Sequence, residues 1–576
     1  MRKVLCCAGA IAGAVALVGA SAASADQYVV VYQEGASTAA AHQAIRDAGG
    51  TIVSENTDVG VATVQSSDPS FAKKADAKAA LEGAARNQAI GHAPGASTKP
   101  SWRDVESERG NFHGNGPRPR PVNGDPLSGL QWDMQLIGAT PTGSYAHDQG
   151  SHAVRVGIMD TGVDGKHPDI APNFDRFLSR NFTVDNSEPG IDDGPCEHPT
   201  CVDPVDEDDD GHGTHVASTI GSPLNGLGMA GVAPKVDLVN IRAGQDTGFF
   251  LLQPTVDALT YAGKVGIDVV NMSFYIDPWL FNCTSNPADS PEQQEQQRMI
   301  IEATTRAVNF AHRHGVTLIA AAGNESTDLG NPTFDDTSPD FPPDAAHERT
   351  IDNGCLSMPS EAPHVLDVSS VGPINTASSP YPRKAYYSNY GVEQTVVAAP
   401  GGDSREFFGT PQYNAPENRI LAAYPLNVAQ ACGEVDANGV PNGTTLCDVS
   451  NPGTVVPRSV PLVRNCANGV CALYQWIQGT SMASPHAVGV AALIVSEKGR
   501  RDWAHGGLTM SPDKVEQVLR RTATDTPCPA QEPFVYPSNP GTYDATCVGT
   551  PAFNGFYGDG IVNALAASKS GGGDRR

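Results

Sequence analysis

The stretch AVRVGIMDTG, residues 153–162, decides the fold of this chain. Val154 to Met159 is a short run rich in β-branched and apolar residues, and it ends at an acidic residue, Asp160. Three more runs of this kind follow, with helix-like stretches between them. The strand-like runs cover residues 236–241, 268–272 and 316–322, and the helix-like stretches cover 213–220, 255–263, 292–312 and 484–498. Alternating strands and helices predict an α/β fold with a central parallel sheet covered on both faces.

Asp160 stands at the carboxyl end of the first predicted strand, where open α/β sheets carry their functional groups. An acid at this place can be an ordinary turn residue. Asp-Thr-Gly also occurs in aspartic proteases, which need two such motifs to form a pair of carboxylates. In the alternative that we favour, Asp160 orients a histidine and stabilises its charged form.

His212 lies in DGHGTHVA, residues 210–217, at the start of a predicted helix. Isolated histidines are often structural, and His212 with His215 could bind a metal, although no nearby glutamate completes a zinc-binding helix pattern. A neutral imidazole between two glycines has room to approach a serine and take its proton. We therefore predict a general base at His212.

Ser481 lies in GTSMASPH, residues 479–486, directly before an apolar helical run. A serine in this place is commonly no more than a helix cap. Here, however, Gly479 permits close approach of a substrate backbone, and Pro485 fits the first helical turn. The free N–H groups of a helix start would also stabilise an oxyanion. We interpret Ser481 as a nucleophile.

Together these motifs resemble the subtilisin family of serine peptidases over roughly residues 125–567. The order acid, histidine, serine is the order known for subtilisin. Further matching segments are GVAP at 231–234, AAGNE at 321–325, YSN at 387–389, APG at 399–401 and YGDGIVN at 557–563. The resemblance implies a subtilisin-like three-layer fold and a serine endopeptidase that cleaves extended protein or peptide substrates through an acyl-enzyme. It implies the triad Asp160, His212 and Ser481 and no cofactor for the chemistry.

The resemblance also assigns the groups around the triad. Asn324 would be the oxyanion-hole side chain, and the substrate-binding residues would be Ser273, Phe274, Tyr275, Ala321 and Gly323. The family usually has glycine where Tyr275 stands, so this side chain is expected to reshape one wall of the cleft. Glu325 would favour a basic residue before the cut.

A structural calcium ion is a further implication of the resemblance. Asp169 and Asn225 match side chains of a calcium site in the family, with carbonyl groups of the loop 223–229 completing it. The acidic run Asp206 to Asp210 is interpreted instead as a solvated loop, with Asp209 and Asp210 at the rim of the active site.

The chain divides into five predicted parts. Residues 1–25 read as a signal peptide, because the apolar stretch is too short for a membrane anchor. Residues 26–92 alternate strands (28–32, 51–53, 59–64) with a helix (38–48), and 93–124 have the composition of a linker that contains the maturation site. Residues 125–569 form the peptidase domain, and 570–576 a disordered tail. By the resemblance, 26–92 is a ferredoxin-like propeptide that inhibits its own enzyme; a separate binding module is the alternative.

Composition limits the partners and the compartment. The formal net charge of −26 makes nucleic acid and membrane surfaces poor partners, and we expect a monomer. Ten cysteines follow the signal peptide and indicate disulfides in an exported protein. We predict the pairs Cys196–Cys201, Cys283–Cys355, Cys432–Cys447, Cys466–Cys471 and Cys528–Cys547. A zinc site at Cys196, His198 and Cys201 is the weaker alternative.

Two other functions fit the same motifs. An acyl-transferase would pass the acyl group to an amine, with water excluded by the long loops at 176–206, 277–298, 326–360 and 425–473. An inactive scaffold would not need Asp160, His212, Asn324 and Ser481 together. Peptide-bond hydrolysis is therefore the leading hypothesis.

Overall fold

The computed structural model of the chain describes residues 26–86, 105–106, 120–122, 124–185, 187–188, 191–193, 196–340, 345–442, 446–447, 455–456 and 461–570. The predicted signal peptide, most of the linker and all but the first residue of the predicted tail lie outside these residues. Within the described part of the chain, no helix combines the length and the apolar character needed to cross a membrane.

The N-terminal unit is a four-stranded antiparallel sheet with two helices, in the sheet order β2-β3-β1-β4. Its elements are β1 (Asp26–Tyr32), α1 (Thr38–Ala48), β2 (Thr51–Asn56), β3 (Val61–Ser66), α2 (Phe71–Asp76) and β4 (Leu81–Arg86). Gly49 ends α1 in the left-handed conformation that glycine adopts at no steric cost. The arrangement confirms the predicted ferredoxin-like unit, and it adds α2 and β4 to the predicted elements.

A seven-stranded sheet forms the centre of the large unit, in the order β17-β16-β12-β10-β5-β9-β6, with parallel pairing throughout. Its strands are β5 (Arg155–Met159), β6 (Arg180–Asn181), β9 (Asp237–Arg242), β10 (Val269–Met272), β12 (Thr317–Ala321), β16 (Val365–Val371) and β17 (Thr395–Pro400). Four of these strands coincide with the four predicted runs.

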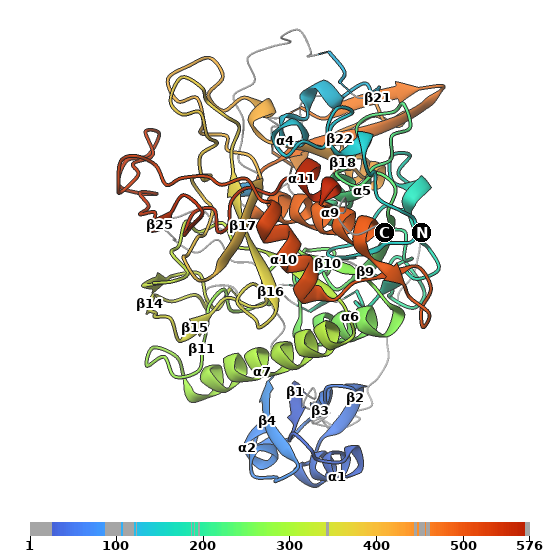
Figure 1. Cartoon of the computed structure of the whole chain (residues 1–576). Helices are drawn as coiled ribbons and strands as arrows, with labels where there is room; N and C mark the ends of the chain where they lie inside the picture. Colours follow the sequence, from blue (N-terminus) through green and yellow to red (C-terminus); the bar gives the residue numbers. More distant parts are fainter. Residues whose placement is uncertain are drawn as a thin grey trace, which may run out of the picture.

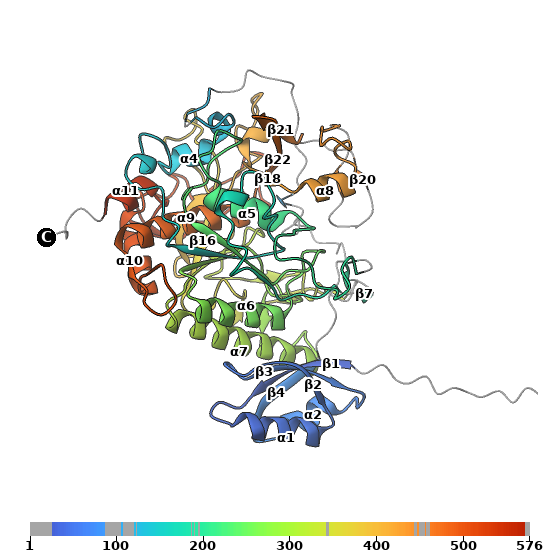
Figure 2. The ribbon, with the colours of Figure 1, turned by 90° about the vertical axis from the view of Figure 1, so that its right-hand side faces the viewer.

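Helices cover both faces of this sheet, which confirms the three-layer α/β fold (Figures 1 and 2). One face carries α6 (Leu252–Val265) and α7 (Pro291–Arg313). The other carries α5 (His212–Gly221), α9 (Thr480–Lys498), α10 (Pro512–Thr522) and α11 (Ala564–Lys569). Helix α9 is buried on all sides from Thr480 to Val495, which explains its uniformly apolar and small-residue sequence.

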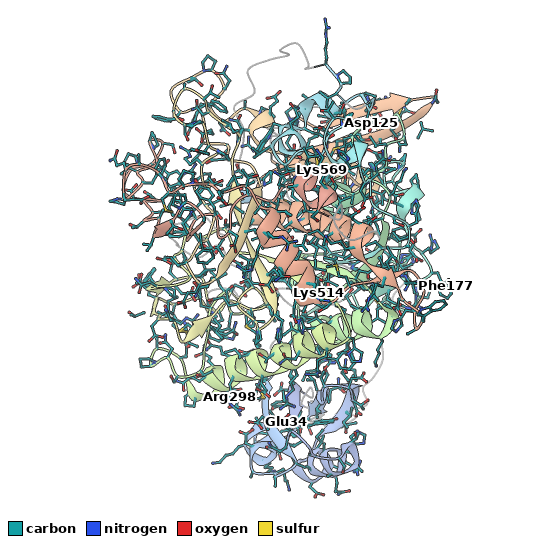
Figure 3. All side chains as sticks on the ribbon, viewed as in Figure 1. Glu34, Asp125, Phe177, Arg298, Lys514 and Lys569 are labelled. Carbon is teal, nitrogen blue, oxygen red and sulfur yellow. A yellow bond between two sulfur atoms is a disulfide. The ribbon has the colours of Figure 1, made fainter. Side chains whose placement is uncertain are left out.

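The N-terminal unit packs on the outer side of α6 and α7, as Figure 2 shows. Val31 and Val61 share one apolar cluster with Met299 of α7. Polar contacts surround it: the Arg306 guanidinium donates to the Tyr32 carbonyl at 2.7 Å. Arg298, labelled at the border of the two units in Figure 3, pairs with Glu82 at 3.3 Å. The antiparallel sheet is therefore held by a continuous core and a charged rim.

Shorter elements surround this frame. They are α4 (Trp132–Leu136), β7 (Ser187–Glu188), β8 (Ile191–Asp192), β11 (Asn282–Cys283), β13 (Phe334–Asp335), β14 (Arg349–Thr350), β15 (Cys355–Leu356), β18 (Ile420–Tyr424), α8 (Leu426–Ala431), β19 (Leu446–Cys447), β20 (Val455–Val456), β21 (Val463–Ala467), β22 (Val470–Ile477), β23 (Arg500–Arg501), β24 (Leu508–Thr509), β25 (Gly549–Thr550) and β26 (Phe553–Asn554). The predicted loop 425–473 thus contains a helix and a strand that pairs with β22.

Disulfides form between the cysteines that the sequence predicts to pair. Four of the predicted pairs are present: Cys196–Cys201, Cys283–Cys355, Cys466–Cys471 and Cys528–Cys547. The first of them excludes the zinc alternative, because both thiols are consumed. Cys432 is also disulfide-bonded, but the side chain of its predicted partner lies outside the described residues.

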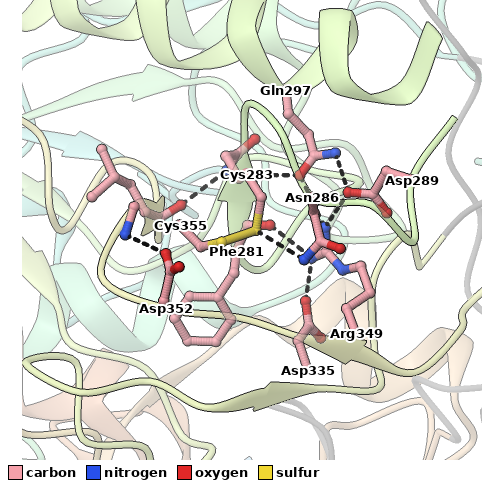
Figure 4. The surroundings of a disulfide bond; sticks show 12 residues. Phe281, Cys283, Asn286, Asp289, Gln297, Asp335, Arg349, Asp352 and Cys355 are labelled. Carbon is pink, nitrogen blue, oxygen red and sulfur yellow. Dashed lines mark hydrogen bonds and ion pairs between the residues drawn. A yellow bond between two sulfur atoms is a disulfide. The ribbon is translucent and has the colours of Figure 1, made fainter. Parts of the chain in front are cut away.

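The two loops joined by Cys283–Cys355 are also tied by a buried cation (Figure 4). The Arg349 guanidinium, fully buried, pairs with Asp289 at 3.0 Å and with Asp335. It also donates to the Phe281 carbonyl at 2.7 Å. Because the charge is paired on two sides, the interior tolerates it.

Candidate active site

Asp160 and His212 form a buried pair at the carboxyl edge of the sheet. Asp160 follows β5 and is fully buried, and its Oδ1 lies 2.7 Å from Nδ1 of His212. Oδ1 also accepts from the Thr161 N–H at 2.8 Å. Burial raises the pKa of the Asp160 carboxyl, and the attraction of His212 opposes that rise. Because Nδ1 of His212 contacts this carboxylate, Nε2 is the ring nitrogen that faces away from it.

Asp208, predicted to lie in a solvated acidic loop, is fully buried and holds the segment after β5 against the start of α5. Its carboxylate accepts from the Thr161 hydroxyl at 3.1 Å, from the Gly211 N–H at 2.9 Å and from the Thr214 N–H at 2.9 Å. It thus caps the start of α5 and ties it to the turn after β5. The interpretation of 206–210 as solvated was wrong for Asp208 and for Asp206, which is 2% exposed. The spacing of Asp208 before a helix start is the one signal that could have revealed it.

Ser481 occupies the first turn of α9, with Gly479 at φ +157° just before the helix. A chain of hydrogen bonds fixes this turn to the end of β10. The Ser273 hydroxyl donates to the Ser481 carbonyl at 3.0 Å, and Asn271 bridges Ser273 and Ser484 at 2.9 and 2.8 Å. The sequence segment predicted to bind substrate therefore lies directly beside Ser481.

Asn324 lies beside the same helix start and is held by Thr480, a residue that the sequence analysis did not single out. Its Oδ1 accepts from the Thr480 N–H and from the Thr480 hydroxyl, both at 2.9 Å. The Gly323 N–H in turn donates to the Thr480 hydroxyl at 3.1 Å. Gly323 has φ +106°, and a Cβ there would lie 2.3 Å from the Asn389 side chain. The oxygen of Asn324 is thus engaged, and its Nδ2 lies beside Gly479, 3.4 Å from a Cβ built there.

Glu106, from the predicted linker, enters this arrangement. The Ser481 hydroxyl donates to Glu106 Oε1 at 2.5 Å, and Glu106 Oε2 lies 3.6 Å from His212 Nε2. The two oxygens of one carboxylate therefore bridge the serine and the imidazole. Burial disfavours the charged ring, yet the carboxylates of Asp160 and Glu106 outweigh it and raise the pKa of His212 well above its usual value.

Tyr275 lies three residues after β10 and contacts the long loop 326–360. Its hydroxyl donates to Asp340 Oδ2 at 2.6 Å, and its ring packs partly against the apolar cluster that contains the Cys283–Cys355 disulfide. Burial, followed by the charges of Asp340 and Asp277, raises its pKa well above the usual value. Glu325 is buried and accepts from the Asn389 amide at 2.7 Å.

The residues predicted to hold calcium also lie together. The Asn225 amide donates to Asp169 Oδ1 at 3.0 Å, and Asp169 Oδ2 accepts from the Met229 N–H and the Tyr474 hydroxyl, both at 3.1 Å. Asp125 accepts from the neighbouring Gly226 N–H at 2.7 Å. Burial raises the pKa of Asp169 to about 8. The Asn225 Oδ1 accepts from the Leu227 N–H at 2.8 Å, so the two buried carboxylates are the groups here that fit the oxygen ligands of Ca²⁺.

Two alternatives raised by the sequence do not fit the geometry: a metal site at His212 and His215, and a pair of aspartic-protease carboxylates. His215 faces the carbonyls of Ile420 and Gln475, at 3.3 and 3.2 Å, so it does not share a ligand with His212. A second Asp-Thr-Gly occurs at residues 246–248. Its Asp246 pairs with Arg242, whereas Asp160 faces His212, so no carboxylate dyad forms.

The fold and this geometry define the class: an α/β protein with an aspartate–histidine–serine site at the carboxyl edge of a parallel sheet. A family model described as "Subtilase family" matches residues 151–560. The chain belongs to the subtilase family, which confirms the resemblance found in the sequence.

Curated relatives agree with this assignment. The chain is 29% identical to Subtilisin Savinase of Lederbergia lenta over 74% of this chain and 94% of that protein. It is 28% identical to Thermitase of Thermoactinomyces vulgaris over 68% and 90%. The match to the Major intracellular serine protease of Bacillus subtilis (strain 168), at 29% identity, covers 43% of this chain and 65% of that protein, which is just under two thirds.

Solved structures show the same fold. The epidermin leader peptide processing serine protease of Staphylococcus aureus matches with a TM-score of 0.59 at 20% identity, over 95% of this chain and 98% of that one. Fervidolysin of Fervidobacterium pennivorans, a keratinolytic enzyme, matches with a TM-score of 0.54 at 20% identity, over 95% and 61%.

Proposed function

We propose that this protein is a serine endopeptidase with the triad Asp160, His212 and Ser481. The observation that carries the proposal is the 2.7 Å contact between the buried Asp160 and His212 Nδ1, with the Ser481 hydroxyl and His212 Nε2 facing one shared carboxylate. The carboxylate is that of Glu106. Because it contacts both Ser481 and His212, its position indicates where the scissile carbonyl group of a substrate would lie.

In the proposed reaction, His212 Nε2 takes the Ser481 hydroxyl proton while Oγ forms a bond to the substrate carbonyl carbon. The Asn324 Nδ2 donates to the oxygen as it becomes negative. The imidazolium then gives its proton to the departing amine as the C–N bond breaks. Water, deprotonated by the same ring, releases the acyl group and restores the serine. Asp160 stays ionised and stabilises the imidazolium in each step.

Substrates bind, in this proposal, as an extended strand between two segments that follow neighbouring strands. Ser273, Phe274 and Tyr275 follow β10, and Ala321 and Gly323 end and follow β12. An extended peptide placed there satisfies its backbone groups as an added strand would. The carboxylates of Glu325 and Asp340 near Tyr275 support a basic residue before the cut.

We further propose that the chain is an exported precursor. The disulfides support an oxidising compartment, and the charged stretch and apolar run of residues 1–25 support export. The ferredoxin-like unit would be the inhibitory propeptide, supported by its packing on α6 and α7 and by the linker residue found in the active site. Residues 26–92 and 93–124 would then be removed on maturation.

The proposed calcium ion would be held by Asp169 and Asn225, with carbonyl groups of the loop 223–229. Its role would be structural, because these residues fix a loop between α5 and β9 and do not contact Ser481 or His212 in the described residues. The buried, mutually repelling carboxylates of Asp169 and Asp125 support this proposal.

The test of the enzyme proposal is covalent labelling of the mature form with a fluorophosphonate probe. We expect one label, located on Ser481 by mass spectrometry, and we expect His212→Ala to abolish it together with cleavage of protein substrates. A conservative His215→Gln variant, which alters a buried ring that faces the carbonyls of Ile420 and Gln475, is the matched control for folding. Labelling of Ser481 that persists in His212→Ala would refute the assigned base.

A further inference from the structure

A carboxylate side chain occupies the site, and it comes from the chain itself. Glu106 meets Ser481 through one oxygen at 2.5 Å and His212 through the other at 3.6 Å. Its Cγ lies so close to Gly479 that a Cβ built there would be 3.1 Å away. The glycine before Ser481 thus admits the glutamate, as it would admit a substrate.

Val105 anchors this glutamate. Its side chain is only 1% exposed and belongs to the main apolar cluster of the large unit. Its carbonyl accepts from Gln478 Nε2 at 3.0 Å, and Gln478 is held by the Ser404 N–H at 2.7 Å. The buried Val105 side chain and the hydrogen bond from the Gln478 side chain to the Val105 carbonyl therefore fix the position from which Glu106 reaches Ser481 and His212.

The chemistry of a carboxylate at this place opposes catalysis in two ways. It accepts the hydrogen bond of the Ser481 hydroxyl, so the one hydrogen of that hydroxyl is not donated to His212. It also favours the charged form of His212, and an imidazolium cannot take a proton. A carboxylate is itself a poor acceptor for a serine nucleophile, so the group is not consumed by the enzyme that it blocks.

We propose that the catalytic site binds a side-chain carboxylate and that Glu106 is the resident ligand that holds the precursor inactive. The proposal rests on the triad assigned under the proposed function. It adds that the inhibition is not carried by the ferredoxin-like unit alone: a single linker glutamate disarms both nucleophile and base. Peptides that place an acidic side chain between Ser481 and His212 would inhibit the mature enzyme in the same way.

The experiment compares full-length precursors with Glu106→Gln, which keeps the shape and removes the charge. The rate of fluorophosphonate labelling of Ser481 is measured on the intact precursor, separated by mass from any processed form. We expect labelling to be faster by roughly 10- to 100-fold in Glu106→Gln, the range for losing a hydrogen bond to a charged group. Glu108→Gln, the same charge change two residues along, is expected to label at the wild-type rate.

A second measurement does not depend on labelling. In a Ser481→Ala precursor, the His212 ring is titrated by NMR, and we expect Glu106→Gln to lower its pKa. Equal labelling rates and an unchanged His212 pKa, with a mature form that labels rapidly, would overturn the Glu106 proposal alone. A mature form that does not label at Ser481 would instead overturn the proposed triad.

Discussion

Thr480 offers the sharpest test of how the oxyanion site is built. Its hydroxyl donates to Asn324 Oδ1 at 2.9 Å and accepts from the Gly323 N–H at 3.1 Å. Thr480→Val removes both bonds and keeps the shape of the side chain. Asn324 Oδ1 then keeps the hydrogen bond from the Thr480 N–H, also at 2.9 Å, which continues to orient the side chain.

The magnitude follows from these contacts. Complete loss of such a donor costs about 10²–10³ in turnover, a value established on subtilisin, which is a relative of this protein. Thr480→Val loosens the donor without removing it, and one neutral hydrogen bond is worth about 0.5–1.5 kcal/mol, or roughly 2- to 12-fold in rate. We expect kcat to fall by that factor with KM little changed, since the donor acts mainly in the transition state. The buried Gly323 N–H also loses its acceptor, which lowers the free energy of unfolding by about 1–3 kcal/mol.

The assay is steady-state hydrolysis of a chromogenic peptide by the mature enzyme, paired with denaturant unfolding. Thr480→Ser retains the hydroxyl and is the matched control, with kcat expected close to wild type. The reasoning fails if Thr480→Val leaves kcat unchanged, if it acts on KM instead, or if Thr480→Ser loses as much activity as Thr480→Val.

Two further predictions concern stability. Burial and the nearby Glu361 raise the pKa of Asp367 in β16, so its contribution to stability is full below the pKa of an unfolded aspartate, about 3.9, and is lost as pH rises through the folded value. We expect the unfolding temperature to fall with pH more steeply in wild type than in Asp367→Asn, measured by calorimetry; parallel curves would contradict this. Calcium should raise the unfolding temperature relative to chelator, and Asp169→Asn should abolish the difference; an equal calcium effect in that variant would place the ion elsewhere.

Periodicity predicted the inner strands because they are apolar and continuous, and it predicted α7 because apolar residues recur on its buried face. It missed β16, where Asp367 interrupts the apolar pattern although it is 1% exposed in the sheet. It also missed β17, although that strand is buried throughout and apolar from Val396 to Pro400, and it missed β21 and β22, whose ribbon begins inside a predicted loop. Local sequence reports burial poorly where a buried strand carries a charge or where an exposed strand is paired by a neighbour far along the chain.

The residues proposed for the site, Asp160, His212, Asn324 and Ser481, could be chosen from the sequence because each motif sits at a strand or helix end. Thr480 and Asp208 act through other residues, so their roles depend on hydrogen bonds that only the folded chain defines. Glu106 is a stronger case, because it meets Ser481 from 375 positions away in the sequence. Neither the composition of the linker nor the spacing of its residues distinguishes Glu106 from its neighbours.

The order of strands in the sheet explains why these groups meet. β5, β10 and β12 are neighbours, so the residues that follow them, Asp160, Ser273 and Asn324, emerge side by side at one edge. Each is then fixed by a further bond: to His212, to the Ser481 carbonyl or to Thr480. These bonds set the positions of the groups relative to one another. Control is more readily exerted by a group that enters from outside the frame and changes the protonation of the base, and the carboxylate of Glu106 is placed to do this.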